Sequence, residues 1–329
     1  MKAMVIRQYG GPDQFEQTEL SEPELQSGHV IIKVAASSVN PLDTKIRAGL
    51  VQANPAFPAI LHGDVSGIVT AVAEDVSTLQ PGDEVFGFAG GLKNYQGALA
   101  EYMLADARLL IKKPESLAFA EAAALPVVFI TAWKALIERA QIQPRDKVLI
   151  HAGTGGVGHI AIQIAKWAGA KVYTTVSSEE KARIATRLGA DETINYQQES
   201  VEEYVQRCTG GQGFDMVFDT VGTDNMDKSF QAARVSGTVA TIAARSTHDL
   251  SPLHGKNLTL HVVFIATPLL YGQDFDNHRD ALEAMFSLTG DGYVHPLLDE
   301  EVYTFTEVGK AHQKVESGQA LGKVVLLQG

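Results

Sequence analysis

The stretch KVLIHAGTGGVGHIAIQIAKWAGAKVYTTV covers residues 147–176 and carries the strongest structural signal in the chain. It contains the apolar segment Lys147–His151, the glycine-rich segment Gly153–Gly158, the amphipathic segment Val157–Ala168 and a second apolar segment, Lys171–Val176. Short apolar runs predict buried strands, whereas apolar residues spaced three and four apart predict a helix. The stretch is therefore predicted to form a strand, a tight turn, a helix and a second strand.

The glycines of this turn predict a dinucleotide site. Gly153, Gly155 and Gly158 have Gly-x-Gly-x-x-Gly spacing, in which the first allows a tight turn, the second lets backbone approach a pyrophosphate and the third lets helix pack on strand. The helix N-terminus offers N–H groups to the phosphates. A glycine-rich turn without a ligand is the alternative, which the flanking strand and helix disfavour. We expect the phosphates to contact Gly153, Thr154, Gly155, Gly156, Val157 and Gly158.

The end of the second strand indicates which dinucleotide binds. A site for NAD usually has an acidic residue there, bonded to the ribose 2′-hydroxyl. Here the strand ends at Val176, Ser177 and Ser178 follow, and Lys181 lies in the next helix. Hydroxyls and a cation suit a 2′-phosphate, so we expect NADPH as the cofactor. The alternative is that Ser177 and Glu180 form a capping box and that Lys181 is only solvated.

The rest of the chain predicts two kinds of architecture. Strands and helices keep alternating after residue 176, with further strands at Asp215–Asp219 and Gly237–Ala243, which predicts a doubly wound parallel sheet. The first third instead has short strands between close turn residues, for example Val30–Ser37 and Gly97–Leu104, which is typical of an antiparallel, barrel-like β unit. We expect an α/β protein with residues 119–267 inserted into a β-rich domain of residues 1–118 and 268–329.

Composition narrows the function classes. The chain has 329 residues, and its 39 acidic and 27 basic residues give a formal charge of −12. No run of Lys and Arg offsets this charge, so we expect no nucleic-acid partner. No apolar run approaches the roughly 20 residues of a membrane helix, and the start lacks a signal-peptide pattern. With Cys208 as the single cysteine, no intrachain disulfide is possible, and we expect a cytoplasmic protein without membrane contact.

Several motifs together resemble the medium-chain dehydrogenase/reductase superfamily, in particular its zinc-free quinone oxidoreductase (zeta-crystallin-like) branch. The motifs occur in family order and span nearly the whole chain: Asn40–Asp43, His62–Gly67, Gly97–Tyr102, His151–Gly158 and Leu188–Asp191. The resemblance implies a GroES-like catalytic domain at residues 1–118 and 268–329 and a Rossmann coenzyme domain at residues 119–267. It also implies a homodimer formed through the strand Leu258–Ile265.

The resemblance also implies that no metal is bound. Asn40 stands where zinc-dependent members have a cysteine, Gly63 stands where they have the zinc histidine, and Asp64 takes the place of a nearby acid. His62 lies one position away and could be proposed as a ligand. Because no cysteine accompanies it, a hydrogen-bonded structural histidine is favoured.

Loss of the metal points to a particular class of acceptor. Zinc would stabilise an alkoxide, whereas quinones and α,β-unsaturated carbonyls delocalise the negative charge that hydride transfer creates. We therefore expect an NADPH-dependent reductase of such small electrophilic acceptors. Two alternatives stay open: a carbonyl or alcohol dehydrogenase of the same superfamily, and a non-catalytic, crystallin-like dinucleotide-binding protein.

The resemblance suggests further site residues. Asn40, Asp43 and Lys45 are the candidates for contact with the acceptor, although the first two could form only a structural turn and Lys45 could be an exposed cation. The remaining candidates correspond to coenzyme contacts, with a core or loop role as the alternative for each: Thr131, Tyr196, Ala243, Ala244, Arg245, Phe264, Ile265 and Ala266.

Overall fold

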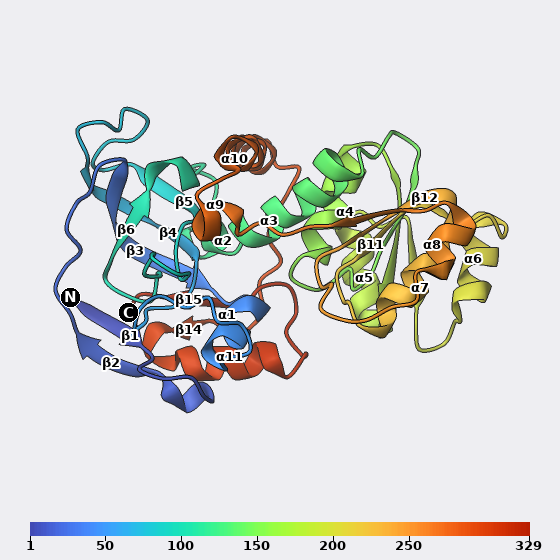
Figure 1. Cartoon of the computed structure of the whole chain (residues 1–329). Coiled ribbons are helices and arrows are strands. Elements are labelled where there is room, and N and C mark those ends of the chain that lie inside the picture. The colour runs from blue at the N-terminus through green and yellow to red at the C-terminus, as the bar shows by residue number, and fades with distance from the viewer. The chain divides into compact units, whose positions relative to one another are not determined.

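The structure is a computed structural model that describes residues 1–329, and the chain divides into two compact units. The first unit comprises Met1–Ile130, Ile265–Gly292 and Pro296–Gly329, and the second comprises Thr131–Phe264 and Tyr293–His295 (Figure 1). These limits differ from the boundaries expected at residues 118 and 267. Helix α2 (Phe119–Ala123) belongs to the first unit, where the Ser66 hydroxyl donates to the Phe119 carbonyl at 2.7 Å.

A seven-stranded sheet forms the framework of the first unit, with strand order β14-β15-β3-β4-β5-β7 and β6 paired to β3. Only β14 and β15 run parallel, and the other pairs are antiparallel, as the sequence predicts. The strands are β3 (His29–Ser38), β4 (Asp64–Val72), β5 (Glu84–Phe88), β6 (Tyr102–Asp106), β7 (Leu110–Lys112), β14 (Tyr303–Thr304) and β15 (Val325–Leu327). Strands β1 (Lys2–Val5) and β2 (Glu16–Glu19) form a separate antiparallel pair.

One predicted strand of this unit is wrong in its first half. The expected strand Gly97–Leu104 begins only at Tyr102. The N–H groups of Gly97 and Ala98 instead donate to the carbonyls of Ile60 and His62, at 2.8 and 2.9 Å. The segment before β6 therefore holds the turn that contains His62, a turn that includes a positive φ of 70° at this histidine.

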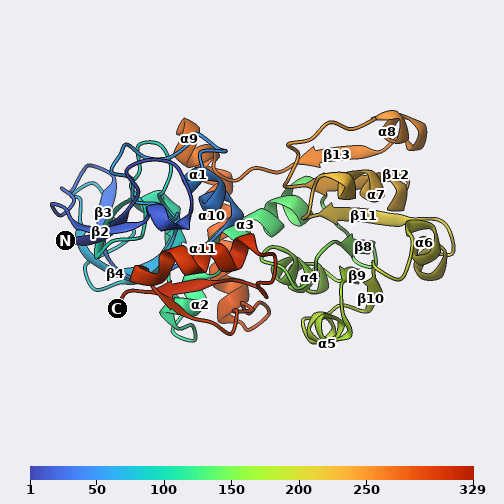
Figure 2. The same cartoon turned by 90° about the horizontal axis from the view of Figure 1, so that it is seen from below.

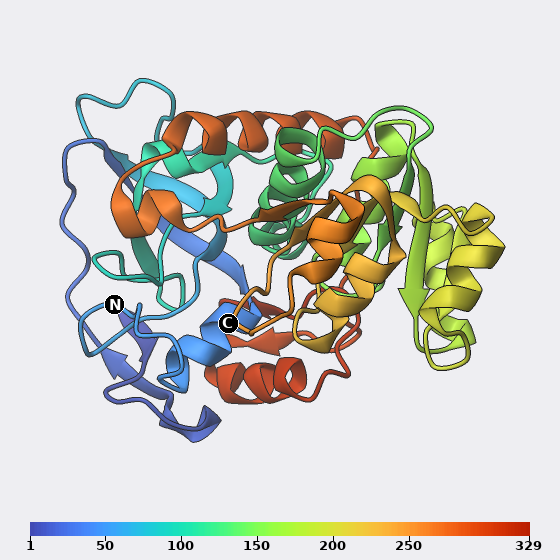
Figure 3. The ribbon, with the colours of Figure 1, turned by 45° about the vertical axis from the view of Figure 1, so that its right-hand side comes forward.

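The helices of the first unit cover this framework. They are α1 (Pro41–Arg47), α2, α9 (Thr267–Tyr271), α10 (Phe275–Gly290) and α11 (Val308–Glu316), with short 3₁₀ turns η1 (Pro12–Gln14), η2 (Ala107–Leu109) and η4 (Phe305–Glu307). Helix α3 (Pro126–Trp133) crosses into the second unit. Helix α11 packs against α1, so the C-terminal part of the chain lies beside residues near its start (Figure 3).

The second unit is the predicted doubly wound parallel sheet. Its strand order is β10-β9-β8-β11-β12-β13, and all pairs are parallel. The strands are β8 (Lys147–Ile150), β9 (Lys171–Val176), β10 (Glu192–Asn195), β11 (Phe214–Asp219), β12 (Ala233–Thr241) and β13 (Thr259–Val262). The expected edge strand Leu258–Ile265 is thus confirmed in its central part only.

Helices of the second unit form two packed groups (Figure 2). The π-helical segment η3 (Lys134–Arg139) packs with α4 (Gly158–Trp167), and α6 (Val201–Thr209), α7 (Asp224–Ala232) and α8 (Ser251–Lys256) pack in sequence. Helix α5 (Glu179–Arg187) packs on β9 and β10. A buried cluster around Tyr173, Phe214 and Phe230 fills the space beneath α6 and α7. No helix of the chain is both long and apolar enough to cross a membrane.

Candidate functional site

The glycine-rich turn between β8 and α4 has the predicted close packing. A Cβ on Gly158 would lie 2.1 Å from the Ala152 carbonyl oxygen, and a Cβ on Gly153 would lie 2.1 Å from Thr174 Oγ1. At Gly155 the nearest atom would be 3.2 Å away. Gly153 and Gly158 are therefore needed by the fold itself, whereas at Gly155 a Cβ would meet only the Ala152 carbonyl oxygen, in a tight but milder contact.

Backbone donors at this turn fit a pyrophosphate. Helix α4 begins at Gly158, so the N–H groups before its first turn have no partner inside the helix. The N–H groups of Gly156 and Val157 have no acceptor in the chain. Together with the partial positive charge at the helix N-terminus, these donors suit the two phosphates of a dinucleotide.

The ends of β9 and β10 bring three predicted residues to one edge. Val176 pairs with Asn195, and the Tyr196 N–H donates to the Val176 carbonyl at 3.3 Å. Tyr196, Ser177 and Lys181 are partly or largely exposed there, and Tyr196 keeps 54% of its surface. The edge that the sequence assigns to the coenzyme therefore carries partly exposed aromatic, hydroxyl and cationic side chains.

The capping alternative for this edge needs a correction. Ser178, not Ser177, is the N-cap residue of α5, and its Oγ accepts from the Lys181 N–H at 3.2 Å. Ser178 is thus partly committed to the helix. The hydroxyl of Ser177 and the ammonium of Lys181 have no hydrogen-bond partner in the chain, so both can contact a phosphate.

The predicted loops at the other half of the sheet follow β12 and β13. Asp219 at the end of β11 fixes this region, because its carboxylate accepts from the Gly222 N–H at 3.0 Å and from Thr241 Oγ1 at 3.2 Å. Residues Ala243, Ala244 and Arg245 follow β12, and Thr131 is buried in α3. Phe264 belongs to the second unit, but Ile265 and Ala266 belong to the first.

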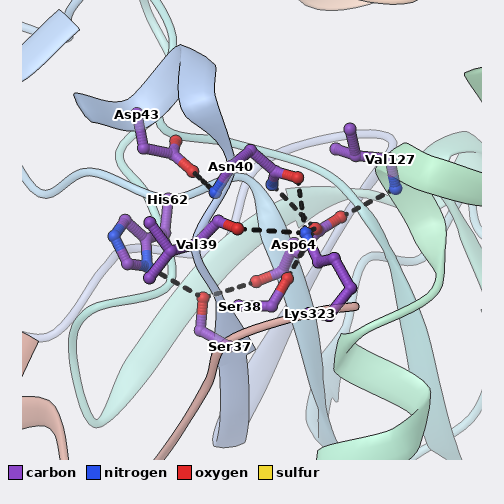
Figure 4. A network of polar contacts seen from close by, with 9 residues as sticks. All are labelled: Ser37, Ser38, Val39, Asn40, Asp43, His62, Asp64, Val127 and Lys323. Carbon is purple, nitrogen blue, oxygen red and sulfur yellow. Dashed lines mark hydrogen bonds and ion pairs between the residues drawn. The ribbon is translucent and has the colours of Figure 1, made fainter. Parts of the chain in front are cut away.

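A second polar cluster lies in the first unit around Asp64 (Figure 4). Asp64 is fully buried, and its Oδ2 accepts from Ser38 Oγ at 2.7 Å and from Asn40 Nδ2 at 2.8 Å. Its Oδ1 accepts from the Val127 N–H at 3.0 Å. Lys323 Nζ lies 3.4 Å from Asp64 Oδ2 and donates to Asn40 Oδ1 at 2.5 Å. The cluster therefore pairs one carboxylate with one ammonium in the interior.

Both polar atoms of the Asn40 side chain are used inside this cluster. The amide nitrogen donates to Asp64, and the amide oxygen accepts from Lys323. The Asn40 N–H also donates to Asp43 Oδ2 at 2.7 Å, which fixes the first turn of α1. The structural-turn interpretation of Asn40 and Asp43 is thus confirmed, and it coexists with their place beside a buried charge pair.

The carboxyl group of Asp43 is in an unusual environment. Burial raises the pKa of Asp43 to about 7, and nearby Asp64 raises it further against the opposing Asn40 N–H and Lys323. Asp43 can therefore hold or release a proton near neutral pH, as a general acid must.

Lys45 is not part of the cluster. It lies on the exposed side of α1, whereas Asp43 is buried, because residues two apart on a helix point in different directions. The Lys45 ammonium has no hydrogen-bond or ion-pair partner in the chain. The structure thus joins Asn40 and Asp43 but leaves Lys45 apart from them.

Asn40 and Asp64, which the resemblance places where zinc-dependent members have a cysteine and a nearby acid, do not fit a zinc ion. Asn40 and Asp64 are bonded to the Lys323 ammonium, whose charge would repel a second cation, and no cysteine is present there. No three His, Cys, Asp or Glu side chains gather in an arrangement that could hold a metal.

His62 is a hydrogen-bonded buried residue, as the sequence favours. Its Nε2 lies 2.8 Å from His312 Nε2, and its Nδ1 lies 3.3 Å from Ser37 Oγ. Arg47 Nη1 is 3.4 Å from His312 Nδ1, so that nitrogen is the acceptor and His312 carries its proton on Nε2. Burial lowers the pKa of His62 to about 3, and the pKa of His312 is lowered as well.

Lys323 is the functional-site residue that the sequence analysis missed. It is 3% exposed, and burial lowers its pKa while Asp64 and Asp43 oppose that shift. The available signal is its place two residues before the apolar strand β15, where a lysine is either buried or lies at the strand end. The sequence does not show which carboxylate it meets.

Comparisons with known proteins agree with this geometry. The family described as "Alcohol dehydrogenase GroES-like domain" matches residues 26–115, and the family described as "Zinc-binding dehydrogenase" matches residues 156–288. Quinone oxidoreductase from Pongo abelii is 30% identical over 99% of this chain and 98% of its own. The chloroplastic NADPH-dependent alkenal/one oxidoreductase of Arabidopsis thaliana is 32% identical over 99% of this chain and 79% of its own.

Solved structures show the same relationship. The crystal structure of Escherichia coli quinone oxidoreductase complexed with NADPH has a TM-score of 0.88 and 28% identity, covering 99% of this chain and 100% of the other. The two units are accordingly a GroES-like domain and a Rossmann coenzyme domain, and the coenzyme is a nicotinamide dinucleotide. The chain is an oxidoreductase that belongs to the quinone oxidoreductase branch of the medium-chain dehydrogenase/reductase superfamily.

Proposed function

We propose that this protein is an NADPH-dependent reductase that transfers hydride to quinones or α,β-unsaturated carbonyls without a metal. The observation that carries the proposal is the buried Asn40–Asp64–Lys323 cluster, in which an internal ammonium is bonded to Asn40 and Asp64, the residues that the resemblance places where zinc-dependent members have a cysteine and a nearby acid. An acceptor that delocalises its own charge needs no Lewis acid. The names of the relatives, quinone oxidoreductase and alkenal/one oxidoreductase, support these two acceptor classes.

Three residues are proposed to take part in the reduction: Asp43 and Lys45 act on the acceptor, and Asn40 positions Asp43. When bound, the coenzyme supplies the hydride. Asp43 gives the proton that completes the reduction, because its carboxyl is protonated in part near pH 7. Asn40, held by Asp64 and Lys323, fixes the turn from which Asp43 projects. Lys45 is proposed to offer its ammonium to the acceptor's developing negative charge.

The coenzyme contacts are proposed on the same basis. The glycine-rich turn Gly153–Gly158 binds the pyrophosphate, and Ser177 and Lys181 bind the 2′-phosphate at the edge where Tyr196 is exposed. Thr131 and the segments 243–245 and 264–266 are proposed to approach the nicotinamide.

We further propose a cytoplasmic homodimer. Strand β13 is the edge of its sheet, and Val262 keeps 58% of its surface. An exposed apolar edge strand invites pairing with a second copy, here through Leu258–Ile265. A single cysteine agrees with a reducing compartment. Light scattering of purified protein, which should give twice the chain mass, tests the dimer.

Steady-state oxidation of NADPH and NADH with a panel of quinones, enals, enones and simple ketones tests the main proposal. We expect turnover with NADPH on quinones or enones, no effect of a chelator and less than one zinc per ten chains by elemental analysis. Zinc-dependent turnover of ketones would instead support the dehydrogenase alternative. Dinucleotide binding without turnover on any acceptor would support the non-catalytic alternative.

Coenzyme choice is tested by Lys181→Ala. A charge-assisted hydrogen bond contributes about 1.5–3 kcal/mol, so this variant should bind NADPH about tenfold or more weakly and NADH almost unchanged. Affinities are measured by fluorescence titration. Arg187→Ala, in the last turn of the same helix, is the matched control and should leave both affinities unchanged. Equal wild-type affinity for the two coenzymes would contradict the assignment.

A further inference from the structure

A second cluster of catalytic residue types lies in the second unit, in the loop that joins β12 to α8 beside α7 (Figure 2). His248 Nε2 lies 2.5 Å from Ser246 Oγ, and His248 Nδ1 lies 2.9 Å from Asp227 Oδ1. The serine and histidine come from the loop, and the aspartate comes from α7. None of the three is a candidate for the reductase site.

The hydrogen bonds fix the direction of proton movement. A carboxylate can only accept, so His248 donates its Nδ1 proton to Asp227. Its Nε2 is then left as an acceptor and takes the proton of the Ser246 hydroxyl. This is the serine–histidine–carboxylate order that activates a serine for attack on an acyl group.

Packing holds the histidine and leaves the serine open. Only 5% of the His248 side chain is exposed to solvent. Its ring packs edge-on against the Phe230 ring, with the two ring centroids 6.3 Å apart. Ser246 is exposed, so a small molecule in solution can reach its Oγ. The N–H of Thr247, the next residue, has no acceptor in the chain. The N–H that follows the nucleophile is also one that α/β-hydrolases use to bind an oxyanion.

We propose that Ser246 is an activated nucleophile, and that Ser246, His248 and Asp227 form a second site that accepts acyl groups from small activated esters. The Ser246 Oγ–carbon bond forms as the ester C–O bond breaks. The hydroxyl proton moves to His248 Nε2 and then to the leaving alcohol or phenol. Water attacks the acyl-serine in the same way, releases the carboxylic acid and restores the hydroxyl.

Charge and exposure set the expected size of the effect. General-base assistance contributes about 10²–10⁴-fold. Half of the Asp227 side chain is exposed, so water weakens its effect on His248 and the lower end of that range applies. Ser246 should therefore react about a hundredfold faster than an unassisted serine, which is far below the rate of a dedicated hydrolase.

The test treats the full-length protein with p-nitrophenyl acetate at pH 7.5 and locates acetyl groups by peptide mass spectrometry. Ser251 is the internal control, because its hydroxyl donates to Asp249 Oδ1 at 2.6 Å and meets no histidine. We expect Ser246 to be acetylated about a hundredfold faster than Ser251. His248→Gln should reduce Ser246 to the rate of Ser251, and Asp227→Asn should slow it about threefold to tenfold.

Two results would overturn the proposal. One is acetylation of Ser246 no faster than that of Ser251 in the wild-type protein. Ser246, His248 and Asp227 would then only stabilise the loop through their hydrogen bonds. The other is an unchanged Ser246 rate in His248→Gln or Asp227→Asn, with folding checked by circular dichroism. Neither result depends on NADPH or on reductase turnover, so the site can fail or hold independently of the proposed reductase function.

Discussion

The glycine-rich turn of the second unit and the Asp64 cluster of the first unit are built in opposite ways. The turn is local: consecutive residues from Gly153 to Gly158 provide the close backbone packing and the N–H donors before helix α4. The cluster is assembled from distant parts of the chain, since Asp64 and Lys323 are 259 residues apart. A local site is encoded by spacing alone, whereas a site made of long-range side-chain contacts exists only when the whole sheet has formed.

The Asp64 cluster should therefore be the place where one substitution costs the most stability. Lys323→Met leaves the Asp64 carboxylate buried without its cation, and breaking a buried ion pair typically costs about 3–5 kcal/mol. We expect a loss of about 3 kcal/mol in the free energy of unfolding, because Ser38, Asn40 and Val127 still donate to Asp64. Urea titration measures this loss.

The double variant Asp64→Asn with Lys323→Met is the control for that experiment. It removes both charges, so it should be more stable than Lys323→Met alone. If the two substitutions lower the free energy of unfolding additively, the two charges are not coupled. The contrast between a long-range and a local site would then lose its main support.

Two substitutions in the glycine-rich turn should affect NADPH binding and thermal stability to different degrees. In Gly158→Ala the new Cβ meets the Ala152 carbonyl oxygen at 2.1 Å, so the backbone must move. We expect a lower Tm and at least hundredfold weaker NADPH binding. In Gly155→Ala the new Cβ meets the Ala152 carbonyl oxygen at 3.2 Å, a milder contact, so Tm should fall much less than in Gly158→Ala while NADPH binding still weakens. Calorimetry measures both quantities, and unchanged binding in Gly155→Ala would show that the pyrophosphate does not approach this glycine.

These two regions also show what the sequence could predict. The turn, both neighbouring strands and helix α4 follow from apolar spacing and glycine spacing, because each depends on residues close in sequence. Asn40 and Asp43 could be named from their motif. Lys323 could not, because its partner is set by how β15 pairs with β3 and where β4 lies. The start of β6 does not follow from the sequence for the same reason, since the Gly97 N–H, within the expected strand Gly97–Leu104, donates to the carbonyl of distant Ile60.

Buried ionisable groups in the first unit should give opposing dependences of stability on pH. The pKa of His62 falls from 6.5 to about 3 on folding, so the unfolded chain binds the extra proton and stability drops as the pH falls below about 6.5. His312 acts in the same direction. The pKa of Asp43 rises from 3.8 to about 7 on folding, so this group instead adds stability as the pH falls from about 7 towards 4.

Single variants can separate these contributions, each of which amounts to about 1.4 kcal/mol per pH unit. Between pH 6.5 and 5, the wild type should lose stability with the slope of roughly two groups, because the buried histidines His62, His312 and His151, whose pKa values are all lowered on folding, act against one carboxyl. Asp43→Asn should steepen the loss, and His312→Leu should flatten it. Urea titrations at four pH values measure the slopes. A slope that Asp43→Asn leaves unchanged would mean that Asp43 is ionised in the folded protein at neutral pH.

The smallest effect is expected at Lys45, which is exposed on α1 and has no partner within the first unit. If the Lys45 ammonium contacts the carbonyl oxygen of the acceptor, it stabilises the negative charge that grows on that oxygen as hydride arrives. The ammonium therefore lowers the free energy of the transition state more than that of the ground state. Solvent screening weakens the attraction between an exposed ammonium and this charge, so Lys45→Met should lower kcat for enones about fivefold. The kcat for quinones should fall less, since their negative charge spreads over two oxygens. NADPH affinity and Tm should not change. Weaker NADPH binding with unchanged kcat would instead identify Lys45 as a coenzyme contact, and no change at all would leave Asp43 as the only group of α1 that takes part in the reaction.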